Sequence, residues 1–183
     1  LGRLGKKQMS AEVAPEVARN AGAGAFVTGA LMRIGQNRLR LEGYRDALAA
    51  HAIPFDPTYV MPGRWTWESG YDRASNLLRL PQPPTAIFCA NDNMALGALE
   101  AIRAAGKAGK VLVTGIDGIA EMLNVVKAGE GAATVLNDSF WQGGIGLSLA
   151  YAAKTGKIDL KSTPTDKRKY FARAVEADPV NVD

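Results

Sequence analysis

Residues 85–100 read TAIFCANDNMALGALE, and this stretch decides the fold class. Its first five residues are mostly apolar and do not alternate, as in a strand that is covered on both faces. Asn91 and Asp92 follow directly, and a pattern of helical period then runs to Ala105, before Gly106. A buried strand that passes through polar residues into a helix is typical of β–α–β units, and therefore of a parallel sheet.

The same alternation recurs on both sides of this stretch. Further short apolar runs predict strands at residues 25–28, 59–61, 111–114 and 132–136. Segments of helical period predict helices at residues 5–20, 36–50, 67–80, 119–127 and 139–154. We therefore predict an α/β fold, a doubly wound parallel sheet of five strands within residues 1–157.

The last part of the chain has a different character. Residues 158–183 are charged and contain proline, with one candidate strand at residues 170–175. We interpret this part as an appendage or crossover segment that does not belong to the main sheet.

Composition excludes several kinds of site. The 183 residues include one cysteine, Cys89, and one histidine, His51, so neither an internal disulfide nor a Cys-based or multi-His metal site is expected. The net charge of +4 is spread along the chain, apart from a short cluster at residues 167–169, and we expect no nucleic-acid contact through this segment. No apolar run reaches the length that crosses a bilayer.

Polar and aromatic residues follow each predicted strand. Ligands of open parallel sheets bind outside the carboxyl ends of the strands. The candidate ligand-binding residues at these exits are Arg38, Trp65, Asn91, Asp117 and Asn137. A carboxylate, a guanidinium and carboxamides can pair with neighbouring hydroxyl groups, and an indole can cover the C–H face of a sugar ring. The set predicts a sugar as the ligand.

Each candidate also has an ordinary structural interpretation. Asn91 suits a helix N-cap, and Asn137 with Asp138 suits another helix N-terminus. Asp117 precedes a glycine as a turn residue does, and Trp65 could serve packing alone. Arg38 could be an ordinary surface arginine. Because all five residues are expected at one edge of the sheet, a shared binding site is a simpler explanation than five separate structural roles.

Catalysis is not expected from these residues. Acid–base chemistry needs a positioned pair, and His51 ends a predicted helix away from the strand exits. Asp92, Asp117 and Asp138 could cluster, but no nucleophile elbow, metal-ligand spacing or glycine-rich phosphate loop accompanies them. We therefore predict no catalytic residue, no metal and no cofactor.

Four segments resemble a known superfamily. Residues 85–100 and VLVTGIDG at residues 111–118 are similar to signatures of the type 1 periplasmic sugar-binding proteins and the lactose-repressor family. NRLRLEGYRDAL at residues 37–48 and GRWTWESGYDRASNLL at residues 63–78 resemble it as well. The resemblance covers about residues 20–155. It implies a two-lobed protein that closes on a sugar, of which this chain is the C-terminal lobe, with the N-terminal lobe apparently absent.

The resemblance also implies roles for the candidates. In the branch that looks like ribose-binding proteins, the residues matched by Arg38, Asn91 and Asp117 contact the ligand, and an aromatic residue at the place of Trp65 packs on the sugar. Asn137 stands where a glutamine is usual, a departure that shortens the side chain by one methylene.

Two functions fit this superfamily. AATVLNDSFWQGGIG at residues 132–146 and the closing EADPVNVD favour the periplasmic solute receptor of an ABC importer, with a permease as partner. GRWTWESGY at residues 63–71 suits the alternative, the effector lobe of a cytoplasmic sugar-responsive repressor. The residues before Leu1 would decide between a leader peptide and a helix-turn-helix. A lobe without its partner exposes apolar surface, so a homodimer is a further expectation.

Overall fold

The structure is a computed structural model, and it describes residues 28–29, 36–159, 161–164 and 175–182. The strands are β1 (Thr28–Gly29), β2 (Ala86–Cys89), β3 (Leu112–Asp117), β4 (Ala133–Leu136) and β5 (Val175–Ala177). The helices are α3 (Gln36–Ala50), the 3-10 helix η1 (Pro57–Tyr59), α4 (Trp67–Leu78), α5 (Asp92–Ala104), α6 (Ala120–Lys127) and α7 (Ser139–Lys154). The helix expected at residues 5–20 and most of the first expected strand lie outside the described residues.

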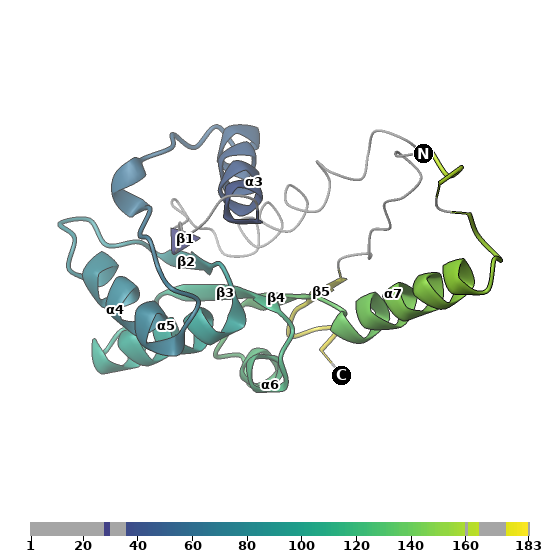
Figure 1. The fold of residues 1–183 in the computed structure, drawn as a ribbon. Coiled ribbons are helices and arrows are strands. Elements are labelled where there is room, and N and C mark those ends of the chain that lie inside the picture. Colours follow the sequence, from purple (N-terminus) through teal and green to yellow (C-terminus); the bar gives the residue numbers. More distant parts are fainter. Residues whose placement is uncertain (1–27, 30–35, 160, 165–174, 183) are drawn as a thin grey trace.

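One sheet organises the domain, with the strand order β1-β2-β3-β4-β5. The first four strands run parallel, so their carboxyl ends meet at one edge. Helix α3 lies on one face of the sheet, and α4, α5 and α6 lie on the other (Figure 1). This arrangement confirms the predicted α/β fold with a doubly wound, mainly parallel sheet.

The end of the chain returns to this sheet. β5 pairs antiparallel with β4, with Thr134 opposite Ala177 and Leu136 opposite Val175. The interpretation of residues 158–183 as lying outside the main sheet is therefore wrong, because their strand satisfies the backbone groups along the free edge of β4. The boundary near residue 157 stays a prediction.

The strand expected at residues 59–61 is also wrong. Asp56 caps a 3-10 turn there, because its side chain accepts hydrogen bonds from the backbone N–H and the hydroxyl of Thr58. Pro57 begins that turn, and Met61 makes only a single bridge. The side chains of Tyr59 and Met61 pack against the core, although these residues do not form a strand.

Two apolar clusters hold the layers together. Alternate residues of β2 point to opposite faces, so Ile87 and Cys89 pack with α4, α5 and α6, while Phe88 packs with α3. Helices α4 and α5 approach closely at two glycines: a Cβ on Gly70 would lie 2.2 Å from the Met94 carbonyl oxygen, and one on Gly97 would lie 2.0 Å from that of Trp67. This contact fixes the first half of α5 against the first turns of α4.

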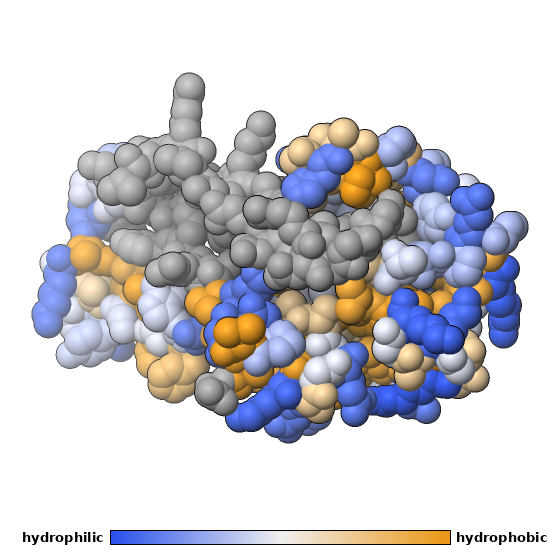
Figure 2. All heavy atoms as spheres, turned by 180° about the vertical axis from the view of Figure 1, so that it is seen from behind, coloured by the Kyte–Doolittle hydropathy of each residue, from blue (hydrophilic) through white to orange (hydrophobic). Residues whose placement is uncertain are grey.

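Helix α7 differs from the other helices. It projects away from them beyond the β4–β5 end of the sheet (Figure 1) and has no buried residue. Phe140 and Leu147 are 93% and 75% exposed. Seen from behind, the surface of the molecule carries several apolar patches (Figure 2). Among the helices of the described residues, none is both long and apolar enough to cross a membrane.

Candidate functional site

Asn91 joins two loops at the start of α5. Its side-chain oxygen accepts a hydrogen bond of 3.0 Å from the backbone N–H of Met94, so Asn91 is the N-cap of that helix. Its amide nitrogen donates a bond of 3.1 Å to the carbonyl of Trp65. The capping interpretation of Asn91 therefore applies. One hydrogen of the side-chain amide remains for a ligand, although the residue is only 6% exposed.

Trp65 lies in the loop before α4 and is half-buried. Its φ angle is 68°, an uncommon value for a residue with a bulky side chain. Its ring packs partly against the main core, and its position depends on the bond from Asn91. The packing interpretation of Trp65 therefore applies, and the residue is only partly exposed.

Asp117 ends β3 with a φ angle of 138°, and Gly118 follows with 73°. Burial raises the pKa of the Asp117 carboxyl, the charge of Asp92 raises it further, and the nearby Arg40 guanidinium lowers it. Asp117 is half-buried, and its carboxyl lies within electrostatic range of one cation, Arg40, and of a second carboxylate, Asp92.

Arg40 is the residue that the sequence interpretation missed. Its guanidinium carbon lies 4.9 Å from the centroid of the Trp65 ring, within cation–π distance. Burial lowers its pKa, and the charge of Asp117 opposes that effect. Within the part of the chain that the structure describes, its Nε atom is buried without a hydrogen-bond partner. Arg40 therefore connects the aromatic residue and the carboxylate of the site.

A signal for Arg40 was present in the sequence. Residues four apart share one face of a helix, and Tyr44 and Leu48 are the large buried residues of α3. One further turn back along the same stripe is position 40. Arg38 lies at the start of α3, but its side chain is outside the described residues, and its role stays a prediction.

Asn137 lies beside Asp117 through the backbone. Its N–H donates a hydrogen bond of 3.0 Å to the Asp117 carbonyl oxygen. Its side chain is exposed and accepts a hydrogen bond from the side-chain amide of Gln142. The capping role at α7 belongs to Asp138, which accepts from the backbone N–H of Trp141. Asn137 is thus free of the helix-cap function that we weighed for this pair.

Two contact pairs, Asn91 with Trp65 and Asn137 with Asp117, lie on either side of Arg40, which stacks on the Trp65 ring and acts electrostatically on Asp117. The set offers a guanidinium, a carboxylate, two carboxamides and an indole ring, which together can bind vicinal hydroxyl groups and an apolar ring face. It offers no activated nucleophile: Cys89 is buried, and burial raises the pKa of its thiol to about 12. In the described residues, no group of three His, Cys, Asp or Glu side chains could hold a metal ion.

Comparison with known proteins finds one family model and relatives of two kinds, periplasmic binding proteins and repressors. The chain matches the family described as periplasmic binding protein domain over residues 8–158. It is 42% identical over 111 residues to the D-allose-binding periplasmic protein of Escherichia coli (strain K12), covering 60% of this chain and 34% of that protein. It is 51% identical over 67 residues to the probable HTH-type transcriptional repressor ExuR of Bacillus subtilis (strain 168), covering 37% of this chain and 20% of that protein.

A solved structure extends the similarity to almost the whole chain. The Caulobacter myo-inositol binding protein bound to myo-inositol superposes with a TM-score of 0.81 at 31% identity. The match covers 97% of this chain and 59% of that protein chain. The chain therefore spans less than two thirds of the length of each of these relatives.

Proposed function

Because the chain belongs to the periplasmic binding protein domain family, we propose that it forms a sugar-binding lobe of the solute receptor of an ABC importer. Its ligand is a monosaccharide or a related cyclic polyol. Under this proposal the protein works in the periplasm, binds without catalysis, and delivers its ligand to an ABC permease.

The juxtaposition of Arg40, Trp65 and Asp117 carries the proposal. The guanidinium donates and the carboxylate accepts, so adjacent hydroxyl groups can each find a partner. The part of the Trp65 indole that Arg40 and the core leave exposed offers an apolar surface to the C–H side of a sugar ring. A hydrogen bond to a charged group contributes about 1.5–3 kcal/mol, so two such bonds with a ring contact support micromolar affinity.

The balance of charge favours a neutral ligand. The charges of Asp117 and Arg40 have opposite signs and act on each other, so the two side chains together present little net charge to a ligand. An anionic sugar would be repelled by Asp117 and by the buried carboxylate of Asp92 behind it. Neutral aldoses and inositols avoid that repulsion.

The mechanism follows from having these groups on one lobe. A ligand that binds better when a second lobe covers it shifts the population towards the closed form. The 183-residue chain presents only its own contacts and cannot exclude water from the ligand. We therefore expect it to bind more weakly than the full-length protein, and equal affinities in calorimetry would contradict the two-lobed mechanism.

The direct test is a binding screen of the full-length protein with D-allose, D-ribose and myo-inositol. A ligand that binds only the folded state raises the melting temperature, and calorimetry then gives its affinity. Asp117→Ala should weaken the affinity about tenfold or more, the size of one charged hydrogen bond. Glu130→Ala, far from the strand exits, is the control, and equal losses in both variants would refute the assignment of Asp117.

Trp65 allows an independent optical test. Ligand addition should change the tryptophan fluorescence of the protein, and Trp65→Ala should abolish that change because its ring lies at the ligand. Trp141→Phe, in the exposed helix α7, should retain it. An unaltered fluorescence response in Trp65→Ala would remove Trp65 from the site.

The second candidate is the effector lobe of a cytoplasmic repressor. The identity of 51% to a repressor over 67 residues favours it, although that match covers 37% of the chain. The two candidates differ in compartment, so fractionation of cells that produce the full-length protein separates them. Recovery with periplasmic markers supports the receptor, whereas cytoplasmic recovery with binding to operator DNA supports the repressor. Sedimentation of the 183-residue chain tests the expected homodimer.

A further inference from the structure

Asp92 is a carboxylate inside the protein, and among the described residues it has no ion-pair partner. Its side chain is 0% exposed. One oxygen accepts hydrogen bonds of 2.7 Å and 2.9 Å from the backbone N–H groups of Gly118 and Ile119. The other oxygen accepts a bond of 2.6 Å from the hydroxyl of Thr134. Asp92 therefore ties α5 to the turn after β3 and to β4.

Helix capping does not explain this arrangement. Asp92 is the first residue of α5, but the cap is Asn91, and all three donors to Asp92 lie outside that helix. The sheet is also shaped around the carboxylate, since a Cβ on Gly115 would lie 2.0 Å from an Asp92 oxygen. The bare backbone of β3 at Gly115 makes room for this side chain.

The turn that Asp92 holds begins at Asp117. A φ of 138° at a residue other than glycine costs free energy and persists only when surrounding contacts enforce it. Two of those contacts are the bonds from the next two N–H groups to Asp92. Asn91 does the same for Trp65, whose φ is 68° and whose carbonyl accepts from Asn91. Adjacent residues thus hold the two strained positions of the site.

We infer that Asp92 is a positioning residue for ligand binding, because it fixes the Asp117–Gly118 turn and thereby sets the Asp117 carboxylate beside Arg40. The inference rests on the proposed function, in which Asp117 and Arg40 contact the sugar. Asp92 itself does not touch the ligand, because its side chain is inaccessible.

The charge of Asp92 also affects the pKa of Asp117. Among the described residues, the groups that act electrostatically on Asp117 are Arg40 on α3, which lowers its pKa, and Asp92 on α5, which raises it. Asp92 acts in the same sense on the buried thiol of Cys89 on β2, raising its pKa. Removing the charge of Asp92 while keeping its shape should therefore move the titration of Asp117 to lower pH.

Asp92→Asn provides that change. Its oxygen can still accept from Gly118 and Ile119, and its amide can donate to the Thr134 hydroxyl, which is also an acceptor. In the full-length protein with D-allose as the probe, Asp92→Ala should weaken binding tenfold or more. Asp92→Asn should restore the affinity to within about threefold of the original protein, because it restores the bonds. If folded Asp92→Ala binds D-allose as well as the original protein, the inference is wrong.

Titration of Asp117 in the ligand-free protein gives a readout that does not depend on a sugar. Carboxyl ¹³C NMR should show the Asp117 midpoint at lower pH in Asp92→Asn and unchanged in Glu130→Gln. If D-allose fails to bind the original protein while this shift appears, the proposed function fails and the coupling stands. An unmoved Asp117 midpoint in Asp92→Asn refutes the coupling between the two carboxylates.

Thr134→Val covers the case in which Asp92→Ala does not fold. It removes one of the three bonds to Asp92 and keeps the charge and a β-branched side chain. We expect a loss of D-allose affinity of about threefold in a folded protein, with altered amide shifts of Gly118 and Ile119. Unchanged affinity and unchanged shifts would overturn the positioning role.

Discussion

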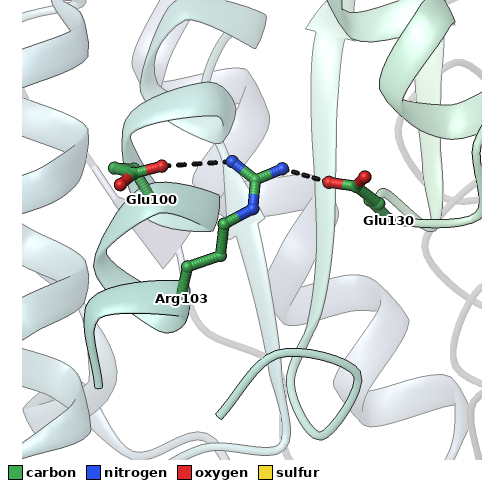
Figure 3. Close-up of polar contacts among 3 residues, drawn as sticks. All are labelled: Glu100, Arg103 and Glu130. Carbon is green, nitrogen blue, oxygen red and sulfur yellow. Dashed lines mark hydrogen bonds and ion pairs between the residues drawn. The ribbon is translucent and has the colours of Figure 1, made fainter. Parts of the chain in front are cut away.

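The two ends of α5 hold carboxylates in opposite ways. At its start, at the strand exits, Asp92 is fully buried and is bound by two backbone N–H groups and one hydroxyl. At its far end, Arg103 lies between Glu100 and Glu130 and forms ion pairs with both, on the surface (Figure 3). The buried carboxylate of Asp92 fixes the geometry of a turn. The exposed trio of Glu100, Arg103 and Glu130 has a smaller effect, because water can solvate these charges as well as they pair with one another.

The backbone differs between the same two regions. At the strand exits the positive φ angles fall on Trp65 and Asp117 as well as on Gly118. At the opposite edge they fall on glycines such as Gly106 and Gly129, where an added Cβ would meet nothing. Ala52, just after α3, is an exception among the described residues, with a φ of 55° that is usual at a helix end. Strain is concentrated where the ligand is proposed to bind, which is common at functional sites.

Removing each kind of carboxylate should give the largest contrast. Asp92→Ala leaves buried N–H and hydroxyl donors without partners, so we expect the free energy of unfolding to fall by about 3 kcal/mol or more. Glu130→Ala removes an exposed ion-pair partner and should lower it by less than about 1 kcal/mol. Urea denaturation measures both. Similar losses in the two variants would show that burial does not distinguish the two ends of α5.

A glycine pair tests the backbone part of the comparison. Gly118 and Gly129 have nearly equal φ angles of 73° and 74°, so alanine at either position costs about 1 kcal/mol in backbone strain. At Gly118 the new Cβ would also lie 2.7 Å from a methyl carbon of Leu136. We expect Gly118→Ala to destabilise by about 2 kcal/mol and Gly129→Ala by about half of that in the same denaturation assay. Equal costs would mean that the strand-exit turn is as open as the distal one.

Asp117→Asn should weaken ligand binding and raise the free energy of unfolding. Burial raises the pKa of Asp117, so its contribution to folding is present below the ordinary pKa of aspartate and is lost as pH rises through the folded-state value. Above that value the variant should gain stability relative to the original protein, and the gain should vanish in acid. Denaturation curves between pH 3 and pH 8 measure this difference. A variant less stable at neutral than at acid pH, relative to the original protein, would contradict the sign.

The smallest effect belongs to the exposed trio. Arg103→Gln removes both ion pairs, and we expect a change in unfolding free energy of about 0.5 kcal/mol or less, because exposed pairs are weak. Added salt should erase what difference remains, since it screens charges at the surface. A large loss that persists at 1 M salt would show that this cluster has a structural role like that of Asp92.

The sequence predicted the parts of the fold in which local and long-range preferences agree. Residues 85–100 contain an apolar strand, a capping residue and a helix of regular period, and the structure has β2 and α5 there. Residues 59–61 are equally apolar, but Asp56 and Pro57 before them favour a 3-10 turn. The apolar run alone could not separate a strand from a packed turn.

The site was predictable in part for the same reason. Parallel strands bring their exits together, and hydrogen bonds join Asn91 to Trp65 and Asn137 to Asp117 there, while the binding role of these residues stays a prediction. Arg40 is indicated by the rotation of α3, which the buried stripe of Tyr44 and Leu48 sets, whereas Arg38 stays a prediction because its side chain lies outside the described residues. The role of Asp92 could not be predicted, because its three partners lie 26 to 42 residues away in sequence.

The pairing of β5 with β4 has a consequence for synthesis on the ribosome. The parallel strands β1 to β4 and their helices can assemble once Leu136 has emerged, yet the outer side of β4 then still exposes its backbone N–H and C=O groups. Those groups stay unpaired until α7 and the following segment have been translated and Val175–Ala177 pairs with β4. During that interval a nascent chain offers a template to neighbouring chains, and the pairing of β5 with β4 removes it.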